Sequence, residues 1–108
     1  MSLIVGIDLG TTNSVASVYL NGEIKIVIND MGEIITPSVV YINENNEVLV
    51  GQKAKNLRML HPDNTISSIK RLMGTNHVFK IGGKEYTPEQ ISAFILKHIK
   101  EITEKFVG

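Results

Sequence analysis

The residues best suited to chemistry lie near the start of the chain, where an aliphatic run passes into Asp8-Leu9-Gly10-Thr11-Thr12-Asn13. Asp8 stands among apolar residues, so we expect it to be buried, and a buried charge is costly unless a partner neutralises it. Gly10 can adopt the positive φ of a tight turn, which lets backbone N–H groups converge on an anion. The hydroxyls of Thr11 and Thr12 add donors at the same spot. Together these residues predict a cradle for a phosphate group and a metal cation.

An ordinary β-hairpin with Asp8-Leu9-Gly10 at its bend is the alternative interpretation of this segment. Two better known phosphate motifs are absent from the sequence. No G-x-x-x-x-G-K-[ST] occurs, and the spacing of Gly6 and Gly10 does not continue into G-x-G-x-x-G. The spacing of the residues alone therefore leaves both the phosphate cradle and the plain hairpin open.

The composition is that of an ordinary globular protein. The chain has 108 residues, about one domain, of which 43% are hydrophobic and 20% charged. Its 11 basic residues balance 11 acidic ones, so no net positive field favours nucleic acid or an anionic membrane as a partner. The absence of cysteine excludes thiol catalysis and suits a reducing cytosol. The three histidines form no i,i+4 pair, so no zinc site is expected.

The first half of the chain predicts antiparallel strands. Residues 3–9, 14–20 and 23–28 have strand-like apolar patterns, and Asn21-Gly22 is a strong signal for a two-residue hairpin turn. Residues 29–33 predict a loop. Two further strands are expected over 38–42 and 47–50.

The second half predicts three helices and a small hairpin. Helices are expected over 52–60 and 65–73, with Met59 and Met73 as core residues, and a hairpin over 78–86. A long helix follows Thr87, which is its predicted N-cap in a capping box. Its wide apolar stripe, from Ile91 to Phe106, needs a surface to pack on, so we expect this chain to be the front piece of a larger protein.

In sequence order, several segments resemble the Hsp70 (DnaK-type) chaperones. The matching runs are Gly6–Ser14, Thr36–Val40, Val50–Lys55, Asn64-Thr65, Lys70–Gly74 and Gly83–Ser92. The resemblance covers essentially the whole chain. It implies an α/β fold of the actin-like, ribonuclease-H-like ATPase type, of which this chain would be an incomplete first lobe. Residues 1–37 would start the core subdomain, and residues 38–108 would form the outer subdomain.

The resemblance also implies roles for individual residues. Asp8 would hold a hydrated Mg²⁺ beside the nucleotide. Gly10, Thr11 and Thr12 would bind the phosphates of ATP or ADP, and Asn13 lies in the same loop. Lys70 would reach the γ-phosphate and position the attacking water. The chemistry is consistent, because phosphoryl transfer depends on positioning and charge neutralisation.

A cytoplasmic ATP-dependent chaperone is the function that the resemblance implies for the parent protein. Its partners would be unfolded polypeptide clients, a J-domain co-chaperone and a nucleotide-exchange factor. The resemblance is also compatible with K⁺ as a second bound cation. Departures from the family pattern, such as Val15-Ala16-Ser17 after the turn, suggest a diverged paralogue. We expect the 108-residue chain alone to be inactive and to bind ATP poorly, and its exposed edges could allow self-association.

Two alternatives remain at this point. One keeps the fold and changes the class of protein, to another actin-like ATPase or a sugar kinase that shares the Asp-x-Gly-Thr-Thr segment. The other is a non-enzymatic subdomain that docks a partner through the helix face between Ile91 and Phe106.

Overall fold

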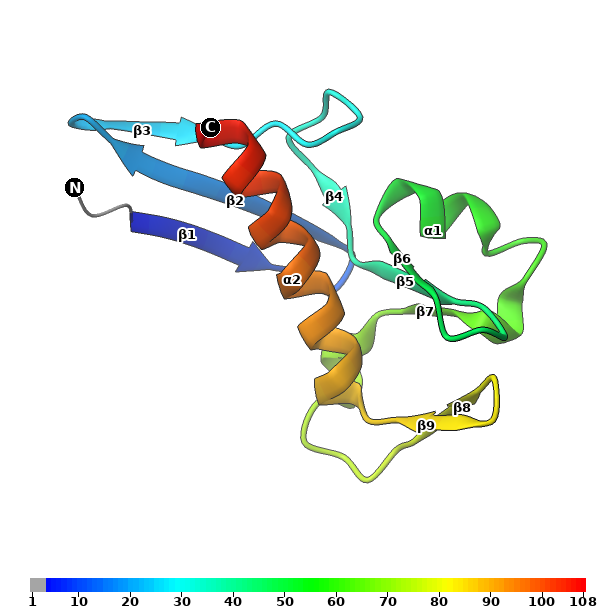
Figure 1. The fold of residues 1–108 in the computed structure, drawn as a ribbon. Helices are drawn as coiled ribbons and strands as arrows, with labels where there is room; N and C mark the ends of the chain where they lie inside the picture. Colours follow the sequence, from blue (N-terminus) through cyan, green and yellow to red (C-terminus); the bar gives the residue numbers. More distant parts are fainter. Residues whose placement is uncertain (1–3) are drawn as a thin grey trace.

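Three antiparallel strands at the N-terminus form the first sheet. The computed structural model describes residues 4–108, and in it β1 (Ile4–Leu9), β2 (Asn13–Leu20) and β3 (Glu23–Ile26) lie in that order (Figure 1). The two-residue turn between β2 and β3 has positive φ at both Asn21 and Gly22, as a type I′ hairpin turn requires. The predicted meander is therefore confirmed. Residue 3, the expected start of the first strand, lies outside the described residues.

The first sheet is completed by β4 (Thr36–Pro37), which pairs with β2. Before β4 the chain makes the predicted loop, and the Asn29 side chain organises it. The Asn29 Oδ1 accepts from the N–H groups of Met31 (2.9 Å) and Glu33 (3.0 Å). The Asn29 amide in turn donates to the hydroxyl of Thr36 (3.1 Å). β3 itself ends at Ile26, before the predicted residue 28, although the Val27 N–H still donates to the Ala16 carbonyl (2.9 Å).

A second sheet is formed by β5 (Val39–Ile42), β6 (Val48–Val50) and β7 (Thr65–Ser67), in the order β6-β5-β7. The predicted helix over 65–73 is wrong. Residues 65–67 pair with Val39–Tyr41, and the chain then turns at Ser68, whose φ of 56° interrupts the strand. Only a short 3₁₀ helix, η2 (Ile69–Leu72), follows. Pairing with β5 overrides the helical spacing of the apolar residues.

The first helix is shorter than expected. α1 (Gln52–Leu57) ends before Met59, which is 92% exposed, and a 3₁₀ turn, η1 (Pro62–Asn64), leads into β7. Met73 is also exposed, so the prediction of both methionines as core residues is wrong. The Asn64 amide donates to the Ile42 carbonyl (2.8 Å) and ties η1 to β5.

The last two elements follow the sequence prediction closely. β8 (Phe79–Ile81) and β9 (Lys84–Tyr86) form the hairpin, and α2 (Pro88–Val107) follows. The capping box is complete, because the Thr87 hydroxyl accepts from the Gln90 N–H (3.2 Å) and the Gln90 side chain accepts from the Thr87 N–H (2.8 Å).

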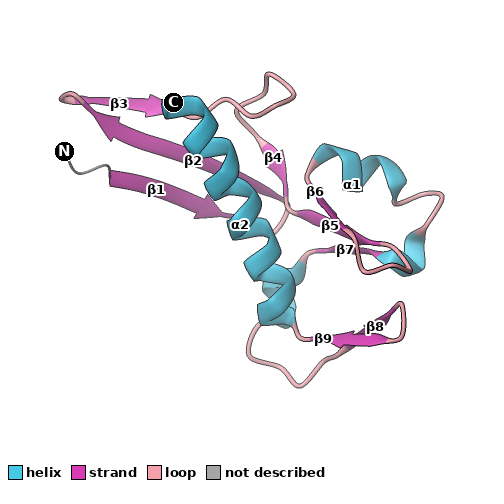
Figure 2. Ribbon diagram, in the orientation of Figure 1, coloured by secondary structure: helices cyan, strands magenta, loops and turns pink. Residues whose placement is uncertain are grey.

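The core lies along α2, which crosses both larger sheets (Figures 1 and 2). Its buried stripe contacts β2, β5, β6 and η2. The stripe consists of Ile91, Ile95, Ile99 and Ile102, with Phe94, His98 and Phe106 half-buried beside it. Among residues 4–108, neither helix has the length and apolar composition needed to cross a membrane.

One face of the first sheet is open. α2 covers the face that carries the buried residues Ala16 and Val18. The register places Ile4, Tyr19 and Ile24 in one row on the opposite face, where they are 63%, 48% and 73% exposed. Because cross-strand partners share a face, Ile26 lies there too, opposite Ser17. We call these four residues the open sheet face.

Candidate functional site: the Gly10–Thr12 turn

The turn between β1 and β2 is closed by a hydrogen bond from the Gly10 N–H to the Asn13 carbonyl (3.0 Å). A Cβ at position 10 would lie 2.5 Å from that carbonyl oxygen, closer than real Cβ contacts allow. Gly10 is not among the residues with positive φ, so the expected left-handed conformation is wrong. Glycine is required here because the backbone closes tightly on itself.

A serine outside the predicted motif holds this turn in place. The Ser38 hydroxyl donates to the Gly10 carbonyl (3.0 Å), and the Ser38 N–H donates to the Thr12 carbonyl (2.9 Å). Since the single hydroxyl hydrogen of Ser38 is used, the buried Ser14 hydroxyl must donate to the Ser38 oxygen (2.8 Å). Sequence reasoning missed this role of Ser38. Its only signal is the position after Thr36-Pro37, which pair with the start of β2.

Thr11 and Thr12 border a small cavity of about 70 Å³. Ser67 and Ser68 also border it, and we call the space lined by these four residues the hydroxyl cleft. Two basic residues of the α1 region, Lys55 and Arg58, also line it, with Pro37, Ser38 and Val39. Within residues 4–108, the backbone N–H groups of Thr11 and Thr12 donate to no protein acceptor. The cleft therefore offers hydroxyls, free amide donors and positive charge, the donor set that suits a phosphate.

The position of Lys70 follows from the backbone at Ser68. Ser68 adopts a left-handed conformation (φ 56°, ψ 34°), uncommon for a residue with a side chain. This turns the chain from β7 into η2, which carries Lys70 at the surface two residues beyond the cleft. Lys70 itself does not border the cleft. The structure thus brings the strand before Lys70 to the turn and leaves the lysine side chain exposed beside it.

Asp8 is exposed, so the expectation that it is buried is wrong. It lies near the end of β1 opposite Val15, on an edge strand whose described residues pair only with β2. Alternation along the strand places Asp8 on the same side as Ile4, the side that α2 does not cover. A solvated carboxylate needs no neutralising partner. The burial of Asp8 therefore cannot be used as an argument for a bound cation. Its position two residues before the Gly10 turn is unchanged.

Asn13, the last residue of the predicted motif, faces different surroundings. It is the first residue of β2 and pairs with Pro37. It borders a separate cavity of about 400 Å³, which also has Asn29, Glu33 and Lys55 on its walls. Lys55 therefore borders both this cavity and the hydroxyl cleft.

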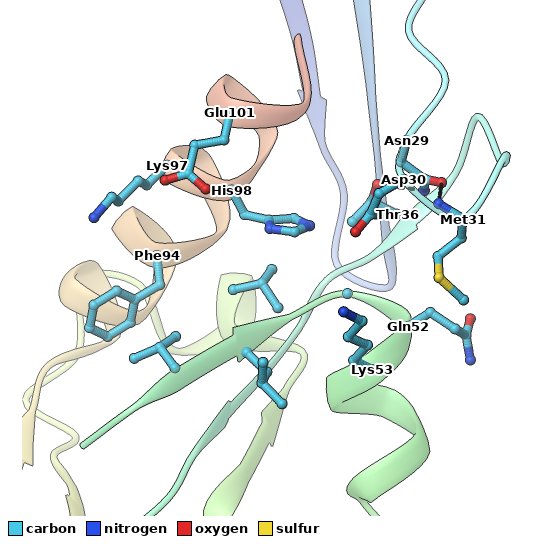
Figure 3. Close-up of a pocket in the computed structure, with 14 residues that line it drawn as sticks. Asn29, Asp30, Met31, Thr36, Gln52, Lys53, Phe94, Lys97, His98 and Glu101 are labelled. Atoms are coloured by element: carbon cyan, nitrogen blue, oxygen red, sulfur yellow. Dashed lines mark hydrogen bonds between the residues drawn. The ribbon is translucent and has the colours of Figure 1, made fainter. Parts of the chain in front are cut away.

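A further pocket, of about 270 Å³, lies between α2 and the 29–31 loop, away from the turn (Figure 3). The His98 ring points from α2 toward Asp30 in this pocket. Burial lowers the pKa of His98, and the positive charges of Lys53 and Lys105 act in the same direction. The carboxylates of Asp30 and Glu101 oppose this lowering of the pKa. None of the motif residues from Asp8 to Asn13 lines this pocket.

Comparison with known proteins gives a consistent result. A model of the family described as Hsp70 protein matches residues 4–80. The chain is 51% identical over 106 residues to the chaperone protein DnaK of Thermotoga neapolitana, covering 97% of this chain and 18% of that protein. It is 50% identical, with the same coverage, to the DnaK proteins of Thermotoga petrophila and Thermotoga maritima. The chain thus spans less than a fifth of the length of these relatives.

Proposed function

Because this chain belongs to the Hsp70 family, whose fold is the actin-like ATPase fold, we propose that its Gly10–Thr12 turn binds the phosphates of ATP or ADP. The parent protein would be an ATP-dependent chaperone that binds and hydrolyses ATP to control its hold on unfolded polypeptides. The observation that carries the proposal is the turn itself. Ser38 fixes the turn with two hydrogen bonds, and the two threonines of the turn, whose N–H groups donate to no acceptor among residues 4–108, border one cleft.

We assign the phosphate contacts to Thr11 and Thr12, supported by their place on the hydroxyl cleft. Asp8 would hold Mg²⁺ through water. The exposed position of Asp8 leaves its carboxylate accessible to a hydrated ion. Mg²⁺, when bound, supplies positive charge against the phosphate oxygens. Lys70, on a long exposed side chain, would add a second positive charge.

The remaining proposals concern the whole protein. A J-domain co-chaperone and a nucleotide-exchange factor would be its partners, and the cytoplasm its location. A division into a core subdomain up to residue 37 and an outer subdomain from residue 38 is supported by the change of sheet between β4 and β5. Asn13 would take part through its backbone in the same loop, because it closes the turn with Gly10.

A chimaera tests this function. The chain would replace the matching N-terminal segment of the Thermotoga neapolitana DnaK protein, and ATP hydrolysis would be measured. We expect an active chimaera whose kcat falls about 100-fold with Lys70→Ala, because a positive charge at the reacting phosphate is lost. The matched control is Lys80→Ala, an exposed lysine on β8, which should leave kcat unchanged. A folded chimaera without activity, or equal rates for the two variants, would contradict the proposal.

A further inference from the structure

Two positive charges reach the hydroxyl cleft from a part of the chain that the predicted motif does not include. Lys55 lies in α1, and Arg58 is the residue that ends this helix. Residues three apart on a helix share a face, and both of these border the cleft. Thr11 and Thr12 of the turn border the same cleft.

α1 is held firmly enough to fix these charges in space. Its residue Ala54 is fully buried, and the helix packs against β4, β5, β6 and β7. The backbone bond from Lys55 N–H to the Gly51 carbonyl (2.9 Å) closes the first turn of the helix, and the bond from Arg58 N–H to the Lys55 carbonyl (3.2 Å) closes its end. The charges therefore come from a packed element.

No carboxylate neutralises either charge. Among residues 4–108, the one ion pair within 4.0 Å joins Lys100 to Glu104 on α2, far along the chain from α1. The cleft is also lined mainly by groups that donate hydrogen bonds to an anion, namely the hydroxyls of Thr11, Thr12, Ser67 and Ser68. An arginine in such surroundings has no protein anion to bind.

We propose that Arg58 is an additional phosphate-binding residue, which holds a phosphoryl group in the hydroxyl cleft against Thr11 and Thr12. This inference rests on the proposed function and adds a residue to the same site. A guanidinium can donate two parallel hydrogen bonds to phosphate oxygens, which an ammonium cannot do with the same geometry. The volume of about 70 Å³ lies well below the roughly 300–1,000 Å³ of pockets that enclose whole small molecules. That size suits one phosphoryl group better than a whole nucleotide.

Inorganic tripolyphosphate is the probe that isolates this contact, because it carries the phosphates without a base or sugar. It would be titrated into the 108-residue chain, and the amide NMR signals of residues 11, 12, 67 and 68 would be followed at constant ionic strength. We expect Arg58→Gln to raise the Kd about tenfold, and Arg58→Lys to recover part of the loss. The effect should shrink as NaCl is raised, because Arg58 is exposed.

Lys53→Gln is the matched control, since it removes one positive charge from the same helix but does not border the cleft. An equal change in Kd for Arg58→Gln and Lys53→Gln would overturn the inference and leave the phosphate site at the turn intact. Unchanged amide signals in the wild-type chain would overturn the assignment of phosphate to the turn, and this inference with it. A loss specific to Arg58→Gln supports both.

Discussion

At the scale of single residues, the site depends on backbone contacts that tolerate no added atom. Gly10 packs its α-carbon against the Asn13 carbonyl, and Ser38 fixes the turn from outside with two hydrogen bonds. The positions of Thr11 and Thr12 at the cleft are therefore fixed by backbone contacts within the turn and by Ser38. Thr11 and Thr12 could be predicted from their types and order. Ser38 could not, because its partners lie more than twenty residues earlier in the chain.

Gly10→Ala tests this account of the turn. The new Cβ would meet a backbone oxygen at 2.5 Å, so the turn must open, and we expect the free energy of unfolding to fall by about 1–3 kcal/mol. Urea denaturation measures it. Gly6→Ala is the control, because its Cβ would meet only the Ser17 hydroxyl at 3.1 Å, which a side-chain rotation relieves. Equal losses in the two variants would show that close approach is not what requires Gly10.

At the scale of elements, strand pairing decided what local patterns could not. The spacing of Ile66 and Ile69 suits a helix, yet Ile66 is buried in β7 opposite Val40, and Ile69 begins η2. A short segment with apolar residues at several positions fits both the helical period and the strand period. Pairing with a partner strand then decides that it becomes a strand. α2 shows the opposite case. It is long, carries a complete capping box, and was predicted with its N-terminal boundary.

The packing of α2 against the 29–31 loop should make stability depend on pH. Burial lowers the pKa of His98 below its ordinary value of 6.5. His98 therefore binds a proton more readily in the unfolded chain than in the folded chain. As a result, the free energy of unfolding falls as the pH drops through 6.5. The fall should level off below the folded pKa. Because the ring is only half-buried, we expect a total effect below about 1 kcal/mol.

Urea denaturation between neutral and mildly acidic pH measures this effect. His98→Gln should remove the part of the pH dependence described above, whereas His77→Gln, at an exposed position, should retain it. An unchanged pH profile in His98→Gln would show that the half-buried ring does not control stability in this range.

At the scale of the whole molecule, α2 joins two sheets and leaves one face of the first sheet bare. The open sheet face carries aliphatic and aromatic side chains at 45–73% exposure, beside the strand that ends near Asp8. The hydroxyl cleft at the turn, about 70 Å³ in volume, is far smaller than the roughly 300–1,000 Å³ of a typical small-molecule site.

This geometry predicts weak nucleotide binding by the 108-residue chain. Calorimetric titration with Mg²⁺-ADP should show no binding in the micromolar range, because a cleft of about 70 Å³ is too small to enclose the sugar and base. Asp8→Asn and Lys70→Ala should therefore give the same baseline as the wild type. A micromolar Kd that is lost in Asp8→Asn would show that the first loop is sufficient for binding.

The sequence by itself determined the elements whose signals are local: the hairpin turn at Asn21-Gly22, the capping box of α2, and the order of donors in the Gly10–Thr12 turn. These features depend on interactions between residues within a few positions of one another, so they can be predicted from the sequence. The tertiary structure alone decided the exposure of Asp8, the brace from Ser38 and the presence of Arg58 at the cleft. Each follows from which elements pack together, and residues distant in sequence determine that.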